Sequence, residues 1–201
     1  MVEGFRFLPE YFPPAAQKAL VAEILAILEA NPLYRGAMPR SGAPLSSRDT
    51  NLGPLGWVSD IKVYRYQPTH PVTGKPWPPM PPRVTDLWQT YSACPFEPEA
   101  CLINFYSEDA KMGLHQDRDE AEFSAPVLSI SLGDACLFRV GGTRREERTV
   151  SFRLESGDIV LIGGENRLAF HGVDRIYPAT SALLKNGGRI NLTLRRVSKP
   201  S

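Results

Sequence analysis

Short β-rich segments dominate the second half of the chain, and this pattern restricts the possible folds more than any other feature. Glycine-containing turn signals separate the segments that follow Pro95. The segments are ACLINFY, VLSISL, CLFRV, TVSFRL, DIVLI, LAFHGV and INLTLRR. Several short strands at regular spacing are typical of a β-sandwich or barrel. We therefore predict a jelly roll over residues 100–197, within a single domain that comprises all 201 residues.

Helices are predicted to flank this β-rich region. Residues 14–30, PAAQKALVAEILAILEA, carry apolar residues at helical spacing, and Pro14 suits the first turn. We expect this helix to pack on the sheet. A shorter helix is predicted over residues 85–92, with Thr85 as its N-cap. The predicted class is therefore mainly β, with a jelly-roll core and flanking helices.

The segment between the predicted helices is largely irregular. Residues 36–56 are rich in Gly, Pro and Ser, and residues 67–82 contain seven prolines. A strand over residues 61–66 would place Lys62, Tyr64 and Tyr66 on one face. Long irregular stretches in a compact domain are usually functional. We predict that residues 36–82 supply substrate-recognition loops and a strand.

Composition excludes several classes of protein. Lys plus Arg is 23 and Asp plus Glu is 22, so the net charge of +1 excludes a protein that coats nucleic acid through charge alone. A basic run remains at residues 139–153, which either binds phosphates or is a solvated hairpin. No apolar run is long enough to span a membrane, and the N-terminus lacks a signal-peptide pattern. The three cysteines, Cys94, Cys101 and Cys136, fit reduced thiols of a cytoplasmic protein.

Two of the three histidines fit a metal site. Residues two apart on a strand share a face, so His115 and Asp117 can bind one metal together with His171, which lies on a later predicted strand. Two imidazoles and one carboxylate suit non-haem Fe(II), because they leave positions open for oxygen and a co-substrate. The pattern H-x-D is also common by chance, and a histidine on an apolar strand is more often hydrogen-bonded within a core.

The last predicted strand alternates strictly between polar and apolar side chains. Its polar face comprises Arg189, Asn191, Thr193 and Arg195. Two arginines suit an anionic pocket, because a guanidinium binds a carboxylate through two hydrogen bonds. An edge strand that faces water would show the same alternation, so the pattern alone leaves both interpretations open.

From Cys101 to Arg196 the chain resembles the AlkB family of Fe(II)- and 2-oxoglutarate-dependent nucleic-acid dealkylases, in particular its bacterial DNA-repair members. The matching pieces are LINFY, LHQDRDE, SISLG, FRVGG, SGDIVLIGGENRLAFHGV and RINLTLRR, and TNLGPLGW and TGKPWPPMP extend the match upstream. The family fold is a double-stranded β-helix, that is, a jelly roll with helices on one side, which agrees with the strand pattern. Residues 36–51 depart most from the family pattern.

The resemblance implies a role for each matching position. The iron ligands would be His115, Asp117 and His171. The side chains that bind 2-oxoglutarate would be Asn104, Tyr106, Arg189, Asn191 and Arg195. The side chains that contact the target base would be Trp57, Tyr64, Asp119 and Arg145. The alignment at the last of these positions also allows Arg144.

The resemblance further implies an oxidative DNA demethylase. The enzyme would use Fe(II), 2-oxoglutarate and O₂ to repair N1-methyladenine and N3-methylcytosine, preferably in single-stranded DNA, with release of formaldehyde. We expect a monomer, with RNA as a further partner. The alternatives are a related oxygenase that acts on RNA or protein, and a non-catalytic jelly-roll binding module. The complete set of metal and co-substrate residues argues against the binding module.

Overall fold

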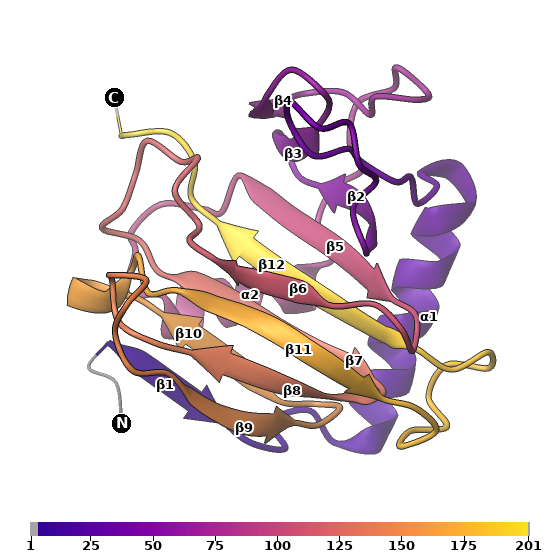
Figure 1. The fold of residues 1–201 in the computed structure, drawn as a ribbon. Helices are drawn as coiled ribbons and strands as arrows, with labels where there is room; N and C mark the ends of the chain where they lie inside the picture. Colours follow the sequence, from indigo (N-terminus) through magenta and orange to yellow (C-terminus); the bar gives the residue numbers. More distant parts are fainter. Residues whose placement is uncertain (1–3, 201) are drawn as a thin grey trace.

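Two antiparallel sheets form the centre of the fold in the computed structural model of the protein, which describes residues 4–200 (Figure 1). The larger sheet has the order β1 (Phe5–Leu8), β10 (Ile159–Ile162), β7 (Val127–Gly133), β12 (Arg189–Arg195), β5 (Ala100–Tyr106) and β2 (Arg48–Leu52). The smaller sheet has the order β6 (Met112–His115), β11 (His171–Tyr177), β8 (Ala135–Val140) and β9 (Val150–Leu154). This is the predicted jelly roll.

The outer face of the larger sheet is covered by two helices, α1 (Pro14–Ala30) and α2 (Pro82–Tyr91). Both helices contribute buried side chains, such as Ile24 of α1 and Trp88 of α2, to one apolar cluster. The sheet contributes outward-facing side chains, such as Leu192 of β12, to the same cluster. The predicted bounds of α1 are confirmed, and Pro14 lies in its first turn. Neither helix is long and apolar enough to cross a membrane, and no other α-helix occurs within residues 4–200.

The predicted start of α2 is wrong. The helix begins at Pro82, so Thr85 lies inside it, where its hydroxyl donates a hydrogen bond to the Pro82 carbonyl instead of capping the end. Pro81 occupies the N-cap position. Proline suits the first helical position, because its ring fixes φ near the helical value and an amide donor is not needed there.

A second cluster of apolar side chains fills the space between the two sheets. It combines residues of the larger sheet, such as Val160 and Ile162, with Phe138 and Val173 of the smaller sheet. These side chains fill one part of the space between the sheets with apolar contacts. The polar face of β12 lies elsewhere between the sheets, and β12 is a central strand with ladders to both β5 and β7. The interpretation of β12 as an edge strand facing water is therefore wrong.

The segment 36–82 contains more regular structure than its composition predicts. β2 pairs with β5 at the edge of the larger sheet, and β3 (Gly56–Ser59) pairs with β4 (Tyr64–Gln67) in a separate two-stranded unit. This β3–β4 unit lies above the edge of the sandwich at the top of Figure 1. The predicted strand at 61–66 begins late, because the Asp60 carboxylate accepts hydrogen bonds from the amides of Lys62 and Val63. Lys62 is therefore part of the turn.

Candidate active site

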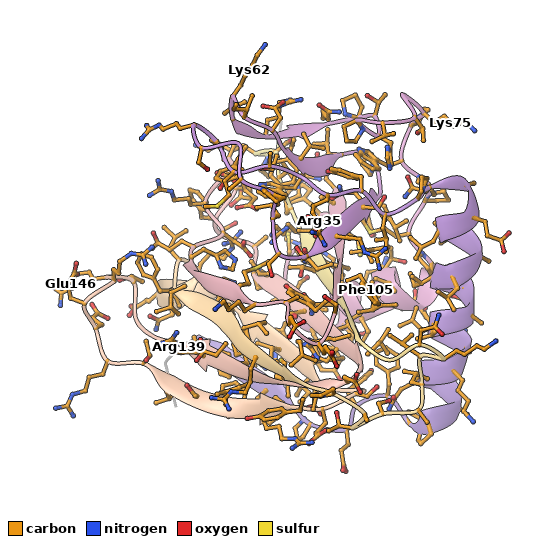
Figure 2. The ribbon with its side chains drawn as sticks, turned by 45° about the vertical axis from the view of Figure 1, so that its right-hand side comes forward. Arg35, Lys62, Lys75, Phe105, Arg139 and Glu146 are labelled. Atoms are coloured by element: carbon orange, nitrogen blue, oxygen red, sulfur yellow. The ribbon has the colours of Figure 1, made fainter. Side chains whose placement is uncertain are left out.

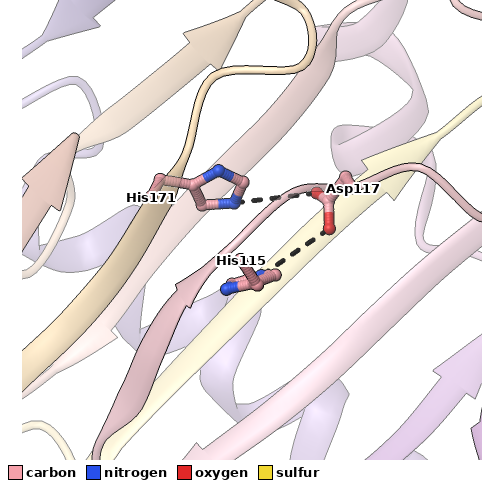
Figure 3. Close-up of side chains that lie close together, drawn as sticks. All are labelled: His115, Asp117 and His171. Atoms are coloured by element: carbon pink, nitrogen blue, oxygen red, sulfur yellow. Dashed lines mark ion pairs between the residues drawn. The ribbon is translucent and has the colours of Figure 1, made fainter. Parts of the chain in front are cut away.

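His115, Asp117 and His171 come together between the two sheets (Figure 3). One possible ligand atom from each lies within 4.8 Å of the others. The Nε2 atoms of both histidines are 3.8 Å from oxygens of the Asp117 carboxylate. His115 is the last residue of β6 and pairs in register with His171, the first residue of β11. Asp117 follows in the loop, so the prediction that His115 and Asp117 share one strand is wrong, although the two side chains do converge.

Hydrogen bonds set the two histidines in the form that a metal requires. The Nδ1 atom of His115 lies 3.0 Å from the Gly113 carbonyl, and that of His171 lies 2.9 Å from the Ala169 carbonyl. A carbonyl only accepts, so each Nδ1 carries a proton, and in the neutral imidazole the lone pair is then on Nε2, the nitrogen near Asp117. Burial, followed by the nearby His115, lowers the pKa of His171 to about 4. The neutral imidazole is the form that binds a metal.

The Asp117 carboxylate is held as an anion by a buried arginine. Arg195 donates to both oxygens, with its Nη2 at 2.9 Å from Oδ1 and its Nε at 3.2 Å from Oδ2. Burial alone would raise the pKa of Asp117, but the charge of Arg195 holds it well below its ordinary value. The carboxylate is therefore ready to bind a cation at any physiological pH.

Two further buried residues, Glu120 and Arg167, support this arrangement and were missed in the sequence. The Glu120 carboxylate contacts Arg195 and Arg167, each at 3.3 Å, and accepts a hydrogen bond from the Tyr66 hydroxyl. Arg167 also donates to the backbone carbonyl of Asp117 at 2.8 Å. A charge run such as DRDE does not reveal which member is buried, so only the fold identifies Glu120. This chain of contacts connects the β3–β4 unit to the metal-binding carboxylate.

One wall of the site has the polar lining that an anionic co-substrate requires. Tyr106 and Arg189 are paired in register on β5 and β12, and Asn104 and Asn191 form the next pair on the same face of the sheet. The guanidinium of Arg189 is 1% exposed and donates to Ser131, while its Nε and Nη1 have no hydrogen-bond partner within residues 4–200. A buried cation with unpaired donors fits a ligand carboxylate. Arg189 does not itself line the cavity, but Tyr106 and Asn191 do.

The predicted base-binding residues also lie around this cavity. The rings of Trp57 and Tyr64 stack on each other, with centroids 5.2 Å apart, and the Trp57 indole donates to the Asp119 carboxylate at 2.8 Å. Arg145 lies 4.7 Å above the Phe170 ring and donates to the Leu114 carbonyl. These predicted residues all line the cavity.

Of the two arginines that the alignment allowed, only Arg145 faces the cavity. Arg144 is 79% exposed and forms an ion pair with Glu147 instead. The cavity has a volume of about 850 Å³ and contains the metal-binding triad, the polar wall and the aromatic pair together. His70 lies apart from this lining. Its ring is buried and bonded to the backbone of Pro32, Val72 and Thr73, which is a structural role.

Comparison with known proteins identifies the family. The family model described as the 2OG-Fe(II) oxygenase superfamily matches residues 4–195. An "Alpha-ketoglutarate-dependent dioxygenase AlkB homolog" of Caulobacter vibrioides is 52% identical over 198 residues, which cover 98% of this chain and 89% of that protein. The chain belongs to the AlkB family of 2OG-Fe(II) oxygenases. It is therefore an Fe(II)- and 2-oxoglutarate-dependent dioxygenase with O₂ as the second co-substrate.

More distant AlkB relatives agree with this assignment. The "Alpha-ketoglutarate-dependent dioxygenase AlkB" of Escherichia coli is 39% identical over 188 residues, which cover 92% of this chain and 86% of that protein. The solved structure titled "The structure of OsALKBH1" superposes with a TM-score of 0.78 at 29% identity and covers 98% of this chain and 99% of the other. The donor set of this AlkB-family chain, with two imidazoles, one carboxylate and a buried guanidinium that has two unpaired nitrogens, fits iron and 2-oxoglutarate.

Proposed function

We propose that this enzyme removes N-methyl groups from bases in alkylated DNA, with N1-methyladenine and N3-methylcytosine as substrates. The observation that carries the proposal is the aromatic pair Trp57–Tyr64, which shares one cavity with the metal-binding triad. A base is a flat π-system, and stacking on aromatic side chains is the usual way to hold one outside the helix. The relatives whose names include AlkB are named as alpha-ketoglutarate-dependent dioxygenases, which supports an oxidative reaction for this enzyme.

The charge of the cavity mouth favours these particular lesions. N1-methyladenine and N3-methylcytosine carry a positive charge near neutral pH, unlike their parent bases. An indole or phenol ring attracts a cation. The Asp119 carboxylate, fixed by the Trp57 indole at 2.8 Å, adds a full negative charge beside the ring. A neutral base lacks this attraction between opposite charges, so the site should favour alkylated bases.

The protein's own contribution to the reaction is positioning. His115, Asp117 and His171 would hold the iron, and Arg189 with Tyr106, Asn104, Asn191 and Arg195 would hold 2-oxoglutarate. When bound, iron and 2-oxoglutarate supply the oxidation of the N-methyl carbon by O₂, after which that carbon leaves as formaldehyde. The aromatic pair places the methyl group, and the surrounding apolar walls, including Phe138 and Val173, keep water away from the reacting carbon.

Phosphate contacts are proposed for only part of the basic segment 139–153. Arg139 forms an ion pair with Asp174, and Arg144 and Arg153 are paired with glutamates. That leaves Arg145 and Arg148, for which no ion pair occurs among residues 4–200. Figure 2 shows that the loop carrying Glu146 projects from the sandwich, while Lys62 points outward from the β3–β4 unit. With only these two cations unpaired in the segment, its contribution to nucleic-acid affinity should be modest and depend on salt.

We also propose a preference for single strands, because flipping a base out of a duplex costs a few kcal/mol that a single strand avoids. Residues 36–82 would supply the recognition part of a single oxygenase domain. All three cysteines are unpaired, which suits a monomer in the reducing cytoplasm.

The test uses purified protein, Fe(II), ascorbate and O₂ with a single-stranded DNA oligomer that carries one N1-methyladenine. Mass spectrometry follows the oligomer with and without 2-oxoglutarate, and matched N3-methylcytosine, duplex and RNA oligomers are assayed in parallel. We expect loss of one methylene mass only with 2-oxoglutarate, fastest on single-stranded DNA. Succinate release without change in any DNA oligomer would refute the DNA substrate, and faster reaction of the RNA oligomer would favour RNA.

A further inference from the structure

A buried carboxylic acid, Asp49, faces the co-substrate side of the cavity and has no role in the function proposed above. It lies on the edge strand β2, is 2% exposed and lines the cavity. Its Oδ1 has no hydrogen-bond partner within residues 4–200. Asp49 pairs in register with Asn104 of β5, so their side chains lie next to each other on the same face of the sheet. A buried acceptor without a partner at this position indicates a group that a ligand completes.

The surroundings of Asp49 favour its neutral form. Burial raises its pKa to about 6, against the opposing effects of a hydrogen bond from Ser47 and the charge of Arg35. The other titratable groups around it are the phenols of Tyr34, from the segment before β2, and of Tyr106, from β5. The pKa of each phenol is raised, chiefly by burial and then by the charge of Asp49, so both stay neutral. Lys111, whose backbone amide bonds Ser46, lines the same cavity.

A dianion that extends from Arg189 to the metal site would lie beside Asn104. It would therefore also lie close to Asp49, which is paired in register with Asn104. If Asp49 were ionised, a third carboxylate would lie beside the two of 2-oxoglutarate and repel them. If Asp49 is protonated, its hydroxyl can donate a charge-assisted hydrogen bond to a carboxylate oxygen of the ligand. We propose that Asp49 binds 2-oxoglutarate as a neutral carboxylic acid, so that the co-substrate enters together with one proton from solvent. This inference rests on the co-substrate pocket proposed above and is independent of the base substrate.

The sign of the pH dependence follows directly. Below pH 6, Asp49 is already protonated in the free protein, so binding needs no further proton. Well above pH 6, each further pH unit lowers the fraction of free protein that has a protonated Asp49 about tenfold. The apparent affinity for 2-oxoglutarate should therefore fall by about 50-fold between pH 6, where about half of the free protein has a neutral Asp49, and pH 8, where about 1% has one. In the variant Asp49→Asn, a neutral amide donates at every pH, so the affinity should not change with pH.

The experiment is calorimetric titration of 2-oxoglutarate into the full chain loaded with Mn(II), which accepts the same nitrogen and oxygen ligands without turnover. Titrations at pH 6, 7 and 8 in two buffers of different ionisation enthalpy count the protons taken up. We expect about one proton per ligand at pH 7 to 8 for the wild type and none for Asp49→Asn. At pH 8 the variant should bind about 10- to 100-fold more tightly. Asp109→Asn, which removes an exposed carboxylate close to β5, is the matched control and should behave as the wild type.

Two outcomes would overturn the inference. Wild-type binding without proton uptake would show that Asp49 stays ionised or lies away from the ligand. An Asp49→Asn variant with unchanged proton uptake would assign the proton to another group. The wild-type proton count needs no variant, so it decides the question even if Asp49→Asn fails to fold. Absence of 2-oxoglutarate binding at every pH would overturn the pocket itself, and demethylation of DNA is scored separately.

Discussion

Replacement of Arg189 by methionine should weaken co-substrate binding and at the same time stabilise the protein that lacks its ligands. The guanidinium is 1% exposed, and two of its three nitrogens have no partner within residues 4–200. Removal of one member of a buried charge pair costs about 2–5 kcal/mol of binding free energy. The dissociation constant of 2-oxoglutarate should therefore rise between about 30-fold and a few thousand-fold.

The stability change has the opposite sign. Methionine keeps the straight aliphatic chain but removes the incompletely paired charge. Replacement of a buried ion pair by apolar residues is neutral or stabilises by about 1–4 kcal/mol, and we expect a change in the same range from removal of this charge. For a chain of this length, 1 kcal/mol corresponds to about 2–4 °C in Tm. Scanning calorimetry without metal measures the stability, and titration calorimetry with Mn(II) measures the binding. Arg189→Lys keeps the charge but not the fork of donors, so its binding should be intermediate. Wild-type affinity in Arg189→Met, or a Tm lowered by several degrees, would refute this reasoning.

Three further substitutions test the other parts of the site. Asp117→Ala removes the only carboxylate of the triad, so succinate release and iron content should both fall to background; a variant that retains succinate release would contradict the ligand assignment. Trp57→Ala should leave uncoupled 2-oxoglutarate turnover intact and weaken binding of the methylated oligomer by about 1–3 kcal/mol, as measured by fluorescence anisotropy. Arg167→Met breaks a buried ion pair with Glu120, so urea unfolding should show a loss of about 3–5 kcal/mol and metal affinity should fall about 10- to 100-fold. Arg144→Met, at an exposed position, is the matched control and should change neither quantity.

The jelly-roll strands could be predicted because their sequences carry alternation, apolar runs and glycine turns. β2 could not, because its sequence RDTNL contains only one apolar residue although four of its five residues are buried. The polar side chains of Asp49 and Asn51 point into the fold, where they meet the cavity and the backbone of Trp57. A strand whose inward face lines a polar site resembles a loop in its composition.

In the site too, residues that belong to a local sequence pattern could be predicted, whereas residues that depend on contacts distant in the sequence could not. The triad and the arginines of β12 could be proposed from the sequence, because scarce histidines and a strict alternation drew attention to them. The pattern alone also allowed a core histidine and an edge strand, and it was the resemblance to the AlkB family that favoured a metal site and an anion pocket. Glu120 and Arg167 could not be proposed in this way, since each owes its importance to contacts with residues 47 or more positions away. Burial of a charged side chain depends on the whole fold, and a run of charges in a sequence is usually a solvated surface.

The placement of Asp117 in a loop, with an arginine already attached to it, bears on how the enzyme acquires iron. In a zinc finger the ion assembles its own ligands, and the chain without metal is unfolded. Here protein groups themselves fix the ligand side chains, through the ion pair of Asp117 with Arg195 and the backbone bonds of the two imidazoles. We therefore expect removal of iron to leave the protein folded, because the contacts that fix its ligands are made by protein groups. Addition of iron to the metal-free protein should then restore activity without a refolding step.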